Sequence, residues 1–341
     1  MKPFLALPLL FVSSLALAQE QQSANSISRE VKEIFDRSAR AVVKIHASDQ
    51  HSDLSGTGFF VDPAGTILTA YSVGGEAENF TAEIDGKQVP ARQVLADLRS
   101  GIAMLKVDMV TPSLAIGHSA NLEVATPVVT IGFPLDLPET PSFGMLAGFD
   151  RKLLGRYFST THLRVNLPTQ RGEAGAPLLN FKGEVVGIVV SSMENGSACY
   201  ALPIDAAEKI RRDFVRFGEP RHGWIGINVE EAATVTDGSR AQMKEIMDGT
   251  PAADSDARPG DILLQVGKTP VHQPEDVIDA SFFITAGDTV PIKVKRGDQV
   301  LTFDIQAGFH PATQHPPVVA SPLSPRQSIP LRLDLPARRT P

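Results

Sequence analysis

A β-hairpin signature lies in the first quarter of the chain, where residues 56–69 read Gly56-Thr57-Gly58-Phe59-Phe60-Val61-Asp62-Pro63-Ala64-Gly65-Thr66-Ile67-Leu68-Thr69. Two apolar runs, 58–61 and 66–69, flank the segment 62–65, whose proline and glycine are typical of a tight turn. Short apolar runs on either side of such a turn predict two antiparallel strands. We therefore expect β-structure here.

The same pattern of short apolar runs and turn signals extends over residues 42–190. Further short apolar runs, separated by turn signals, predict strands at Val42–Ala47, Ile102–Val107, Pro127–Ile131 and Val185–Val190. Helical spacing of apolar residues predicts helices at Ile27–Ala41 and Asp205–Phe217. Many short strands with few helices favour an all-β barrel or sandwich.

A second unit follows the break at Gly218-Glu219-Pro220. We expect its strands at Ile225–Val229, Ile262–Val266, Thr289–Lys295 and Val300–Ile305, and one helix at Pro274–Phe282. The chain of 341 residues is long enough for two such domains.

Composition and charge exclude several classes of function. The chain has 32 Lys and Arg against 39 Asp and Glu, a net charge of −7, and no basic block, which argues against a nucleic-acid binder. The single cysteine, Cys199, rules out an intramolecular disulfide framework, and we expect it to be a small core residue. The histidines are scattered without the spacing of metal ligands, so we expect no metal site and no cofactor.

The two ends of the chain are predicted to lie outside the folded domains. Residues 1–18 have a positive start, an apolar centre and a small-x-small site, which predicts a signal peptide cleaved after Ala18 and export to the periplasm or the medium. An uncleaved membrane anchor is the alternative. Residues 308–341 are rich in proline, so we expect a disordered tail, with a ligand for a proline-binding module as the alternative.

Four blocks of the first unit resemble the HtrA (DegP-like) trypsin-fold serine proteases: residues 56–69, 102–107, 172–180 and 182–188. The resemblance implies a double β-barrel over 19–217 with a cleft between the barrels. In the second unit, 221–229 and 258–271 resemble the PDZ domain that follows the protease in this family, which implies a PDZ domain over 221–307. The expected fold class is mainly β: a trypsin-like double β-barrel followed by an α+β PDZ domain.

The resemblance also implies where a catalytic triad should lie, and this chain departs from it at each position. Ser72 occupies the position of the histidine, Gly101 that of the aspartate and Ala174 that of the nucleophilic serine. A serine hydroxyl is no base near neutral pH, and alanine has no nucleophilic atom. We therefore interpret the first unit as a degenerate protease domain, a pseudoprotease.

Part of the family's machinery can survive these replacements. Main-chain N–H groups of Gly172 and Ala174 are expected to form a pocket like an oxyanion hole, which needs no side chain. Glu173 between them is expected to oppose anion binding.

A displaced triad remains an alternative. Its candidate groups in the first unit are Asp97, Ser119, His46, His51, His118 and His162.

The PDZ resemblance implies a binding site for peptide C-termini. Trp224, Ile225, Gly226 and Ile227 match the loop that holds a terminal carboxylate through main-chain N–H groups, next to an apolar pocket. Packing of the PDZ domain against the barrels is the alternative use of this unit, and Trp224 fits either role.

Three interpretations of function follow. The first is an exported HtrA-like pseudoprotease that binds C-termini or extended segments of proteins as a scaffold, adaptor or holdase in envelope quality control. The second is an active serine endopeptidase with a displaced or non-standard site. The third is a regulatory subunit of active HtrA-type homologues, since members of the family are usually trimers; a homo-oligomer of this chain is expected on the same ground.

Overall fold

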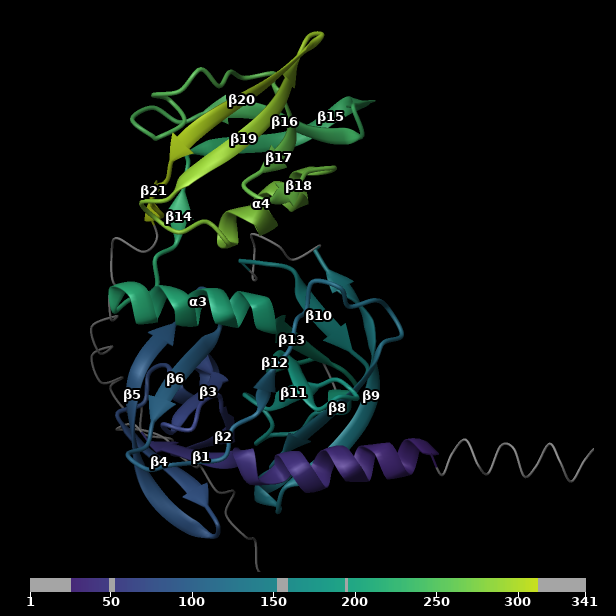
Figure 1. The fold of residues 1–341 in the computed structure, drawn as a ribbon, viewed down its shortest axis with the longest axis vertical. Coiled ribbons are helices and arrows are strands. Elements are labelled where there is room, and N and C mark those ends of the chain that lie inside the picture. The colour runs from purple at the N-terminus through teal and green to yellow at the C-terminus, as the bar shows by residue number, and fades with distance from the viewer. Residues whose placement is uncertain (1–25, 49–52, 152–158, 194–195, 312–341) are drawn as a thin grey trace, which may run out of the picture.

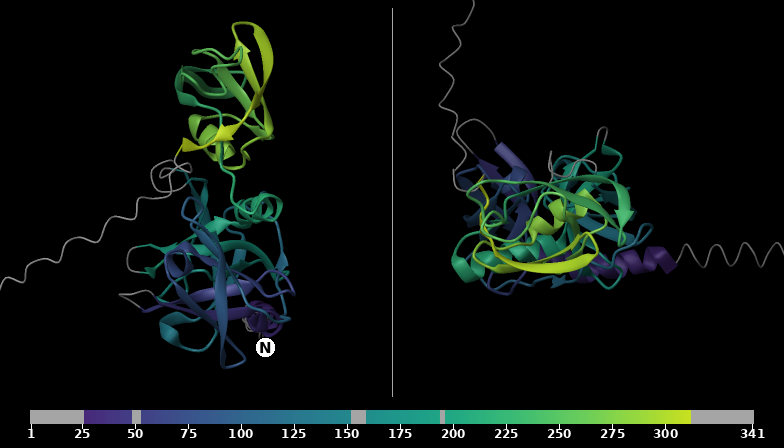
Figure 2. Two further views of the ribbon diagram at one scale, coloured as in Figure 1. Left: turned by 90° about the vertical axis from the view of Figure 1, so that its left-hand side faces the viewer. Right: turned by 90° about the horizontal axis from the view of Figure 1, so that it is seen from above.

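The computed structural model describes residues 26–48, 53–151, 159–193 and 196–311. Two β-barrels lie side by side, helix α3 (Ile204–Phe217) crosses above them, and a smaller sheet domain sits on the far side of that helix (Figure 1). The view along a perpendicular direction shows the same stacking (Figure 2). The predicted signal peptide and residues 312–341 of the predicted tail lie outside the described residues.

The first barrel closes on itself through six antiparallel strands. Their order is β1 (Val42–Ser48), β2 (Asp53–Phe60), β3 (Thr66–Ala70), β6 (Ile102–Lys106), β5 (Lys87–Asp97) and β4 (Asn79–Ile84). The predicted hairpin is β2–β3, in which Phe60 pairs with Ile67 across the turn. Gly65 has a φ of +86°, which a residue with a side chain adopts at a cost.

The second barrel also has six strands, and its last pairing, β11 with β12, closes it. The order is β11 (Pro177–Leu179), β8 (Pro127–Gly132), β9 (Thr140–Asp150), β10 (His162–Val165), β13 (Cys199–Pro203) and β12 (Glu184–Ser192). A short strand, β7 (Ala115–Ile116), adds in parallel to the outer edge of β12. The two closed barrels confirm the expected fold class for the first unit.

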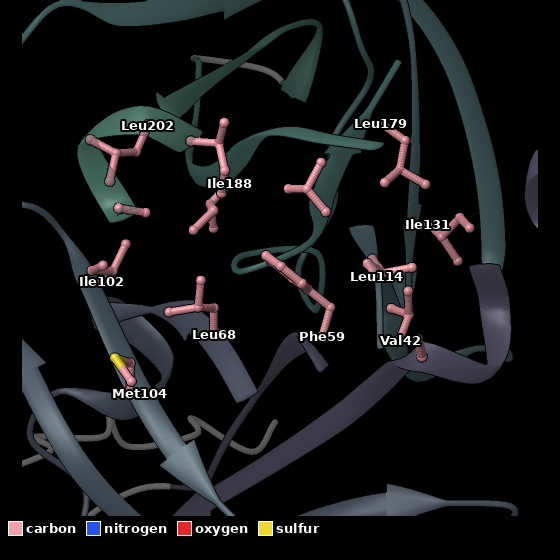
Figure 3. Close-up of a cluster of buried hydrophobic side chains, with 14 of the residues drawn as sticks. Val42, Phe59, Leu68, Ile102, Met104, Leu114, Ile131, Leu179, Ile188 and Leu202 are labelled. Atoms are coloured by element: carbon pink, nitrogen blue, oxygen red, sulfur yellow. The ribbon is translucent and has the colours of Figure 1, made fainter. Parts of the chain in front are cut away.

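The main core lies between the barrels. Figure 3 shows Phe59, Leu68 and Ile102 of the first barrel facing Leu179 and Ile188 of the second. These side chains are fully buried. Burial of a large apolar side chain contributes about 1.5–3 kcal/mol, so this shared core fixes one barrel against the other.

A few helices accompany the barrels. Residues 26–38 are helical and continue into a 3₁₀ turn, η1 (Ala39–Ala41), so the predicted helix at Ile27–Ala41 is confirmed with a tighter last turn. The short elements α2 (Tyr71–Gly74) and η2 (Pro134–Asp136) follow β3 and β8. Helix α3 ends at Gly218, whose φ of +79° gives the left-handed cap that is typical of a helix C-terminus. No helix in the described ranges is both long and apolar enough to span a bilayer.

The second unit is a PDZ domain with one main sheet in the order β15-β16-β17-β19-β20. These strands are β15 (Ile227–Thr236), β16 (Ser239–Ile246), β17 (Ile262–Val266), β19 (Thr289–Arg296) and β20 (Gln299–Gln306), with β18 (Thr269–Pro270) paired to β17. Helix α4 (Pro274–Phe282) has the predicted bounds. Strand β15 begins at Ile227 instead of Ile225, because Gly226 turns the chain with a φ of +84°.

The boundary expected for the Pro-rich tail is wrong by a few residues. Strand β21 (Gly308–Phe309) pairs with β14 (Gly223–Trp224) and so completes the PDZ domain. The Arg221 guanidinium also lies over the Phe309 ring, 5.4 Å from its centroid. These contacts order the segment before the prolines begin to remove backbone donors.

The two domains share a buried interface on α3. Phe282, the last residue of α4, belongs to the same core cluster as Ile204 and Ile210 of α3. Lys209 and Asp213 of α3 form a buried ion pair, 2.8 Å between Nζ and Oδ2, and Asp213 also accepts a hydrogen bond from the Thr285 hydroxyl of the PDZ domain at 3.0 Å. The PDZ domain is therefore packed against the barrels through apolar and charged contacts.

Candidate functional site

A cleft of about 760 Å³ lies at the junction of the barrels and brings together the predicted site residues Ser72, Gly172 and Ala174. Ser72 belongs to α2, directly after β3, and the other two lie in the loop between β10 and β11. Val189, Val190 and Met193 provide apolar wall. The volume is within the range of binding sites for small ligands and peptides.

Gly101 lies next to this cleft. Its carbonyl oxygen accepts a hydrogen bond from the Tyr71 N–H at 2.8 Å, which ties it to the residue before Ser72. A Cβ on Gly101 would lie 3.9 Å from Cγ1 of Val190, in the cleft wall. The three positions at which the family's triad is expected therefore converge in space, although they are far apart in the sequence.

None of the three positions supplies a catalytic group. Ser72 is exposed and its hydroxyl is neutral at physiological pH. Gly101 has no side chain, and its φ of +77° suits glycine. The Ala174 methyl packs against the core cluster of the first barrel. The cleft thus has the shape of a site without a base, an orienting carboxylate or a nucleophile at these positions.

The main-chain donors expected at Gly172 and Ala174 are available. Their neighbours are paired: the Glu173 N–H donates to the Gln170 carbonyl at 3.2 Å, and the Gly175 N–H donates to Val189 at 2.7 Å. The N–H groups of Gly172 and Ala174 make no hydrogen bond with the described part of the chain. Both residues line the cleft, and an unpaired main-chain N–H can donate to an anion or a carbonyl oxygen.

Thr57 of β2 holds this loop in place. Its N–H donates to the Ala174 carbonyl at 2.9 Å, and its Oγ1 donates to the Gly172 carbonyl at 2.7 Å. The Thr69 hydroxyl donates in turn to the Thr57 carbonyl at 2.7 Å. A Cβ on Gly175 would lie 2.1 Å from that same carbonyl oxygen, so only glycine fits. The hydrogen bonds join the loop of the second barrel to two strands of the first.

The expectation that Glu173 opposes anion binding is wrong. Its side chain is buried away from the cleft, where it accepts a hydrogen bond from the Gln170 N–H at 2.6 Å. A Cβ on Gly132 would lie 3.1 Å from its Cγ, which places the side chain against β8. Burial raises the pKa of this carboxyl, despite the hydrogen bond from Gln170. Glu173 therefore puts no exposed negative charge in the cleft.

Cys199 is a core residue, as expected. It is fully buried in the second barrel, and burial, with a smaller contribution from Glu173, raises the pKa of its thiol to about 12. A thiol with so high a pKa is a poor nucleophile and a poor metal ligand. Among the described residues no group of three or more His, Cys, Asp or Glu side chains is placed to bind a metal ion.

The groups considered for a displaced triad have other partners. The Asp97 carboxylate lies 3.0 Å from Nε2 of His222, and both side chains are buried between the domains. The Ser119 hydroxyl donates to Asp205 at 2.8 Å and accepts the Asp205 N–H, which caps the start of α3. Burial alone raises the pKa of Asp97, but the hydrogen bonds from His222 and Ser100 outweigh it and hold the pKa below its ordinary value.

The three described histidines among these candidates, His46, His118 and His162, also lie apart from the cleft lining. Nε2 of His46 lies 3.7 Å from Glu83, and Nδ1 of His118 lies 3.5 Å from Asp205. Nδ1 of His162 lies 2.8 Å from the Thr160 carbonyl oxygen, inside the second barrel. His51 lies outside the described residues.

The second predicted site is the loop 224–227 of the PDZ domain. The carbonyls of Ile225 and Gly226 accept hydrogen bonds from Ala252 and Met247, at 2.9 and 3.0 Å, while their N–H groups make none within the described residues. A Cβ on Gly226 would lie 2.2 Å from Cβ of Thr250. The loop therefore presents main-chain donors in a conformation that only glycine permits.

The surroundings of this loop have the form of a peptide groove. Ile227 begins β15, which is the edge strand of the sheet, so one side of β15 is unpaired in the described fold. Helix α4 packs against β15 and β16. Trp224, by contrast, pairs with β21 and packs edge-on against His310 at 6.3 Å, so its contacts are those of a packing residue.

Sequence reasoning missed the polar contacts between the domains. Arg151 pairs with Asp276 of α4, and Asp279 of α4 accepts hydrogen bonds from the Thr160 hydroxyl and the Thr161 N–H. Each contact joins residues more than a hundred positions apart. Neither periodicity nor a local motif carries a signal for such pairs.

Comparison with known proteins supports this architecture. Residues 56–188 match the trypsin-like peptidase domain family, and residues 223–307 match the PDZ domain family. The chain is 26% identical over 276 residues to a protein of Hahella chejuensis named "Probable periplasmic serine endoprotease DegP-like", covering 77% of this chain and 59% of that protein. The chain has a trypsin-like peptidase domain followed by one PDZ domain, and its relatives are named DegP-like proteases.

Other relatives and solved structures agree with that assignment. The "Putative serine protease HhoB" of Synechocystis is 27% identical, covering 90% of this chain and 84% of that protein. A serine endoprotease from Yersinia pestis superposes with a TM-score of 0.62 at 25% identity, over 82% of this chain and 98% of that one. The "HtrA-type protease AlgW with tripeptide" has the same fold, with a TM-score of 0.71 at 20% identity over 82% and 97% of the two chains.

The chain spans a little over half the length of several curated relatives that it matches. Those relatives are named as periplasmic endoproteases. The matches cover 75–78% of the present chain.

Proposed function

We propose that this protein is an exported HtrA-like pseudoprotease that binds the C-termini or extended segments of other proteins through its PDZ domain. The observation that carries the proposal is the cleft that contains Ser72 and Ala174, with Gly101 beside it. Its role would be that of a scaffold, adaptor or holdase in envelope protein quality control.

The chemistry of these three positions is incompatible with ordinary serine-protease catalysis. Peptide hydrolysis by this fold needs an attacking hydroxyl, a base within hydrogen-bond reach of it, and a carboxylate that orients the base. Ala174, Ser72 and Gly101 supply none of them. Active proteases that lose their triad retain only about 10³–10⁴-fold acceleration over water, which is far below an enzymatic rate.

The PDZ domain keeps what peptide binding requires. A peptide adds as a strand to the free edge of β15, and the N–H groups of Ile225 and Gly226 are placed to bind its terminal carboxylate. The side chain of Ile227 packs against the apolar core of the domain and offers hydrophobic surface at the start of the groove. The partners we infer are therefore polypeptide C-termini.

Location and assembly follow from the family. Periplasmic names among the relatives favour an exported protein, with a signal peptide cleaved after Ala18. A homotrimer is the assembly proposed by resemblance. Mixed oligomers with active homologues would make the chain a regulatory subunit, and co-purification with such a homologue distinguishes that role.

The test of the pseudoprotease proposal is proteolysis of reduced casein by the purified mature chain. We expect no cleavage by the native chain or by the Ala174→Ser variant, because Ser72 accepts no proton from the new hydroxyl. The double variant Ser72→His, Ala174→Ser regains base and nucleophile but has no orienting carboxylate. It should be about 10⁴-fold slower than an intact triad.

Cleavage that follows the native chain through purification, and is lost on a single substitution outside these three positions, would refute the proposal. It would mean a displaced site. A proteolytic activity that separates from the chain during purification comes from a contaminant.

The peptide-binding part has its own experiment, using fluorescence anisotropy with a peptide that ends in an apolar residue. We expect the free carboxylate to bind and the amidated twin to bind at least ten-fold more weakly, because a buried donor pair loses its anion. Ile227→Asp should abolish binding at this groove. Val235→Asp, which adds the same charge to an exposed position at the far end of β15, is the matched control.

A further inference from the structure

We propose that residues 329–335 of this chain bind in the groove of its own PDZ domain, as an extra strand on the free edge of β15. The segment reads Ile329-Pro330-Leu331-Arg332-Leu333-Asp334-Leu335. It occupies the groove until the C-terminus of another protein displaces it. This inference rests on the proposed function, because it names a regulator of the same peptide groove.

The first argument is the order of residues in this segment. Apolar side chains stand at the odd positions, 329, 331, 333 and 335, and proline or charged residues stand between them. In a β-strand, a period of two puts all four apolar side chains on one face. The segment therefore has the pattern of a strand that covers an apolar surface on one side.

The second argument is the position of the prolines. In an antiparallel pair, the N–H groups of alternate residues point to the partner strand, and those between them point away. Pro330 and Pro336 both stand at even positions, where a strand that is paired on one side only needs no donor. The odd positions keep every N–H. The segment can therefore pair along the edge of a sheet, although its prolines exclude it from the middle of one.

The third argument is the surface that β15 offers. Within the described residues its only strand partner is β16, and α4 packs alongside it. Ile227 and Val229 are half-buried against the PDZ core, whereas Asn228 and Glu230 are exposed. A strand added here places its apolar residues beside Ile227 and Val229, a cross-strand contact that stabilises a sheet. Strand β20, at the other edge of the described sheet, has no comparable contact with α4.

Charge also favours this pairing. Residues 312–341 contain four arginines and one aspartate, whereas residues 221–311 contain 14 Asp and Glu against 8 Lys and Arg. Opposite net charges favour the encounter of the tail with the PDZ domain. Arg332 stands at an even position, so pairing puts it on the same face as the exposed Glu230.

The tail leaves the fold beside the groove. The His310 N–H donates to the His222 carbonyl at 2.9 Å, and the His310 ring lies 6.3 Å from that of Trp224, directly before the loop 225–227. Residues 312–328 reach at most roughly 55–60 Å when extended. Antiparallel pairing with Ile227–Glu231 needs only about 17 Å along β15. The connection is therefore long enough to place the segment in the groove of the same chain.

The segment binds by its middle and brings no terminal carboxylate to the N–H groups of Ile225 and Gly226. Each encounter is therefore weak, with a Kd of about 0.1 mM, but a short connection gives an effective concentration of about 1 mM. At these values the groove is filled roughly ten times more often than it is empty. A peptide with a free C-terminus should then bind the native chain about ten-fold more weakly than a chain whose segment does not pair.

The experiment repeats the anisotropy titration on full-length chains with the same labelled peptide. Leu333→Pro removes an N–H from the odd positions and should tighten binding of that peptide about ten-fold. Asp334→Pro, the matched control, adds a proline at an even position and should leave the native affinity unchanged. A peptide of residues 327–337 with blocked ends should compete with the labelled peptide on the Leu333→Pro chain.

Amide signals of β15 give a readout that needs no added peptide. In ¹⁵N-labelled protein, the Asn228 and Glu230 signals should differ between the native chain and Leu333→Pro, and should agree between the native chain and Asp334→Pro. Identical signals in all three chains overturn the inference. A difference that fades on dilution assigns the segment to the groove of a second copy and overturns the arrangement within one chain.

The two proposals fail in different ways. Equal affinities of the three chains for the labelled peptide overturn this inference, and the PDZ proposal stands as long as Ile227→Asp still abolishes binding. Absence of binding even to Leu333→Pro overturns the PDZ proposal instead, and the β15 signals then still decide whether the segment occupies the edge.

Discussion

Phe282 offers the sharpest test of how the PDZ domain is attached to the barrels. It is the last residue of α4, yet it is 0% exposed and packs in the barrel-side core with Ile204 and Ile210 of α3. Its ring also lies 5.8 Å from Nζ of Lys209. Phe283, the next residue, is 40% exposed. The change Phe282→Ala therefore removes the anchor, whereas Phe283→Ala keeps it and removes only an edge-on ring contact, 5.4 Å between centroids.

The expected magnitude follows from burial. A phenylalanine buries about 150–250 Å², and truncating a fully buried one to alanine costs about 3–5 kcal/mol through lost transfer energy and the cavity left behind. Phe283→Ala should cost less, about 1–2 kcal/mol, because 40% of this residue is already exposed and its removal leaves no closed cavity. The difference between the two variants isolates the interface.

Urea denaturation followed by fluorescence of Trp224 is a suitable assay, because this is the only tryptophan in the chain and it lies beside the interface. We expect the free energy of unfolding of Phe282→Ala to fall by about 3–5 kcal/mol, or its PDZ domain to unfold in a separate earlier transition. Equal effects of the two variants would refute the argument, since the PDZ domain would then not depend on this side chain for its attachment.

Two further predictions concern acid stability and the loop frame. Burial lowers the pKa of His162 from 6.5 to about 4, so the folded chain keeps the ring neutral. Above about pH 6.5 the ring is neutral in both the folded and the unfolded chain. As the pH falls from there towards 4, the unfolded chain binds the proton first, and the free energy of unfolding falls by about 3 kcal/mol. The His162→Gln variant should lose less stability than the native chain over that pH range, measured by thermal unfolding. Gly175→Ala should destabilise the chain by several kcal/mol, because its φ is +88° and a Cβ has no room there.

Each of these has a matched control. His118→Gln changes a ring that is 86% exposed and should keep the native pH profile; if both histidine variants behave alike, burial of His162 is not the cause. Gly86→Ala also forces a side chain onto a positive φ, +71°, but with no atom within 4 Å, so it should cost only about 1–2 kcal/mol. An equal cost at Gly175 would show that the clash with Thr57 relaxes.

Local sequence pattern predicted the elements that are locally determined. The bounds of α4 and β17 were predicted to the residue, because each begins and ends at clear turn signals. The long strands β5 and β9 were missed. Their apolar residues are interrupted by polar and glycine positions that only the closed barrels explain.

The candidate site was predicted in part. The sequence resemblance predicted Ser72, Gly172 and Ala174 as site residues, and the structure brings them to one cleft. The direction of Glu173 was not predictable, because burial of its carboxyl depends on the fold of the whole second barrel. The pairing of Asp97 with His222 was equally hidden, since the two residues are 125 positions apart and belong to different domains.

The hydrogen bonds of Thr57 have a consequence for how such a chain changes over time. The loop that would carry a nucleophile is also the joint between the two barrels, so its backbone geometry is required for folding whether or not a reaction occurs there. Replacement of a serine by alanine at position 174 leaves every one of these main-chain bonds in place. Selection for stability alone would therefore preserve the outline of this cleft whether or not a reaction occurs in it.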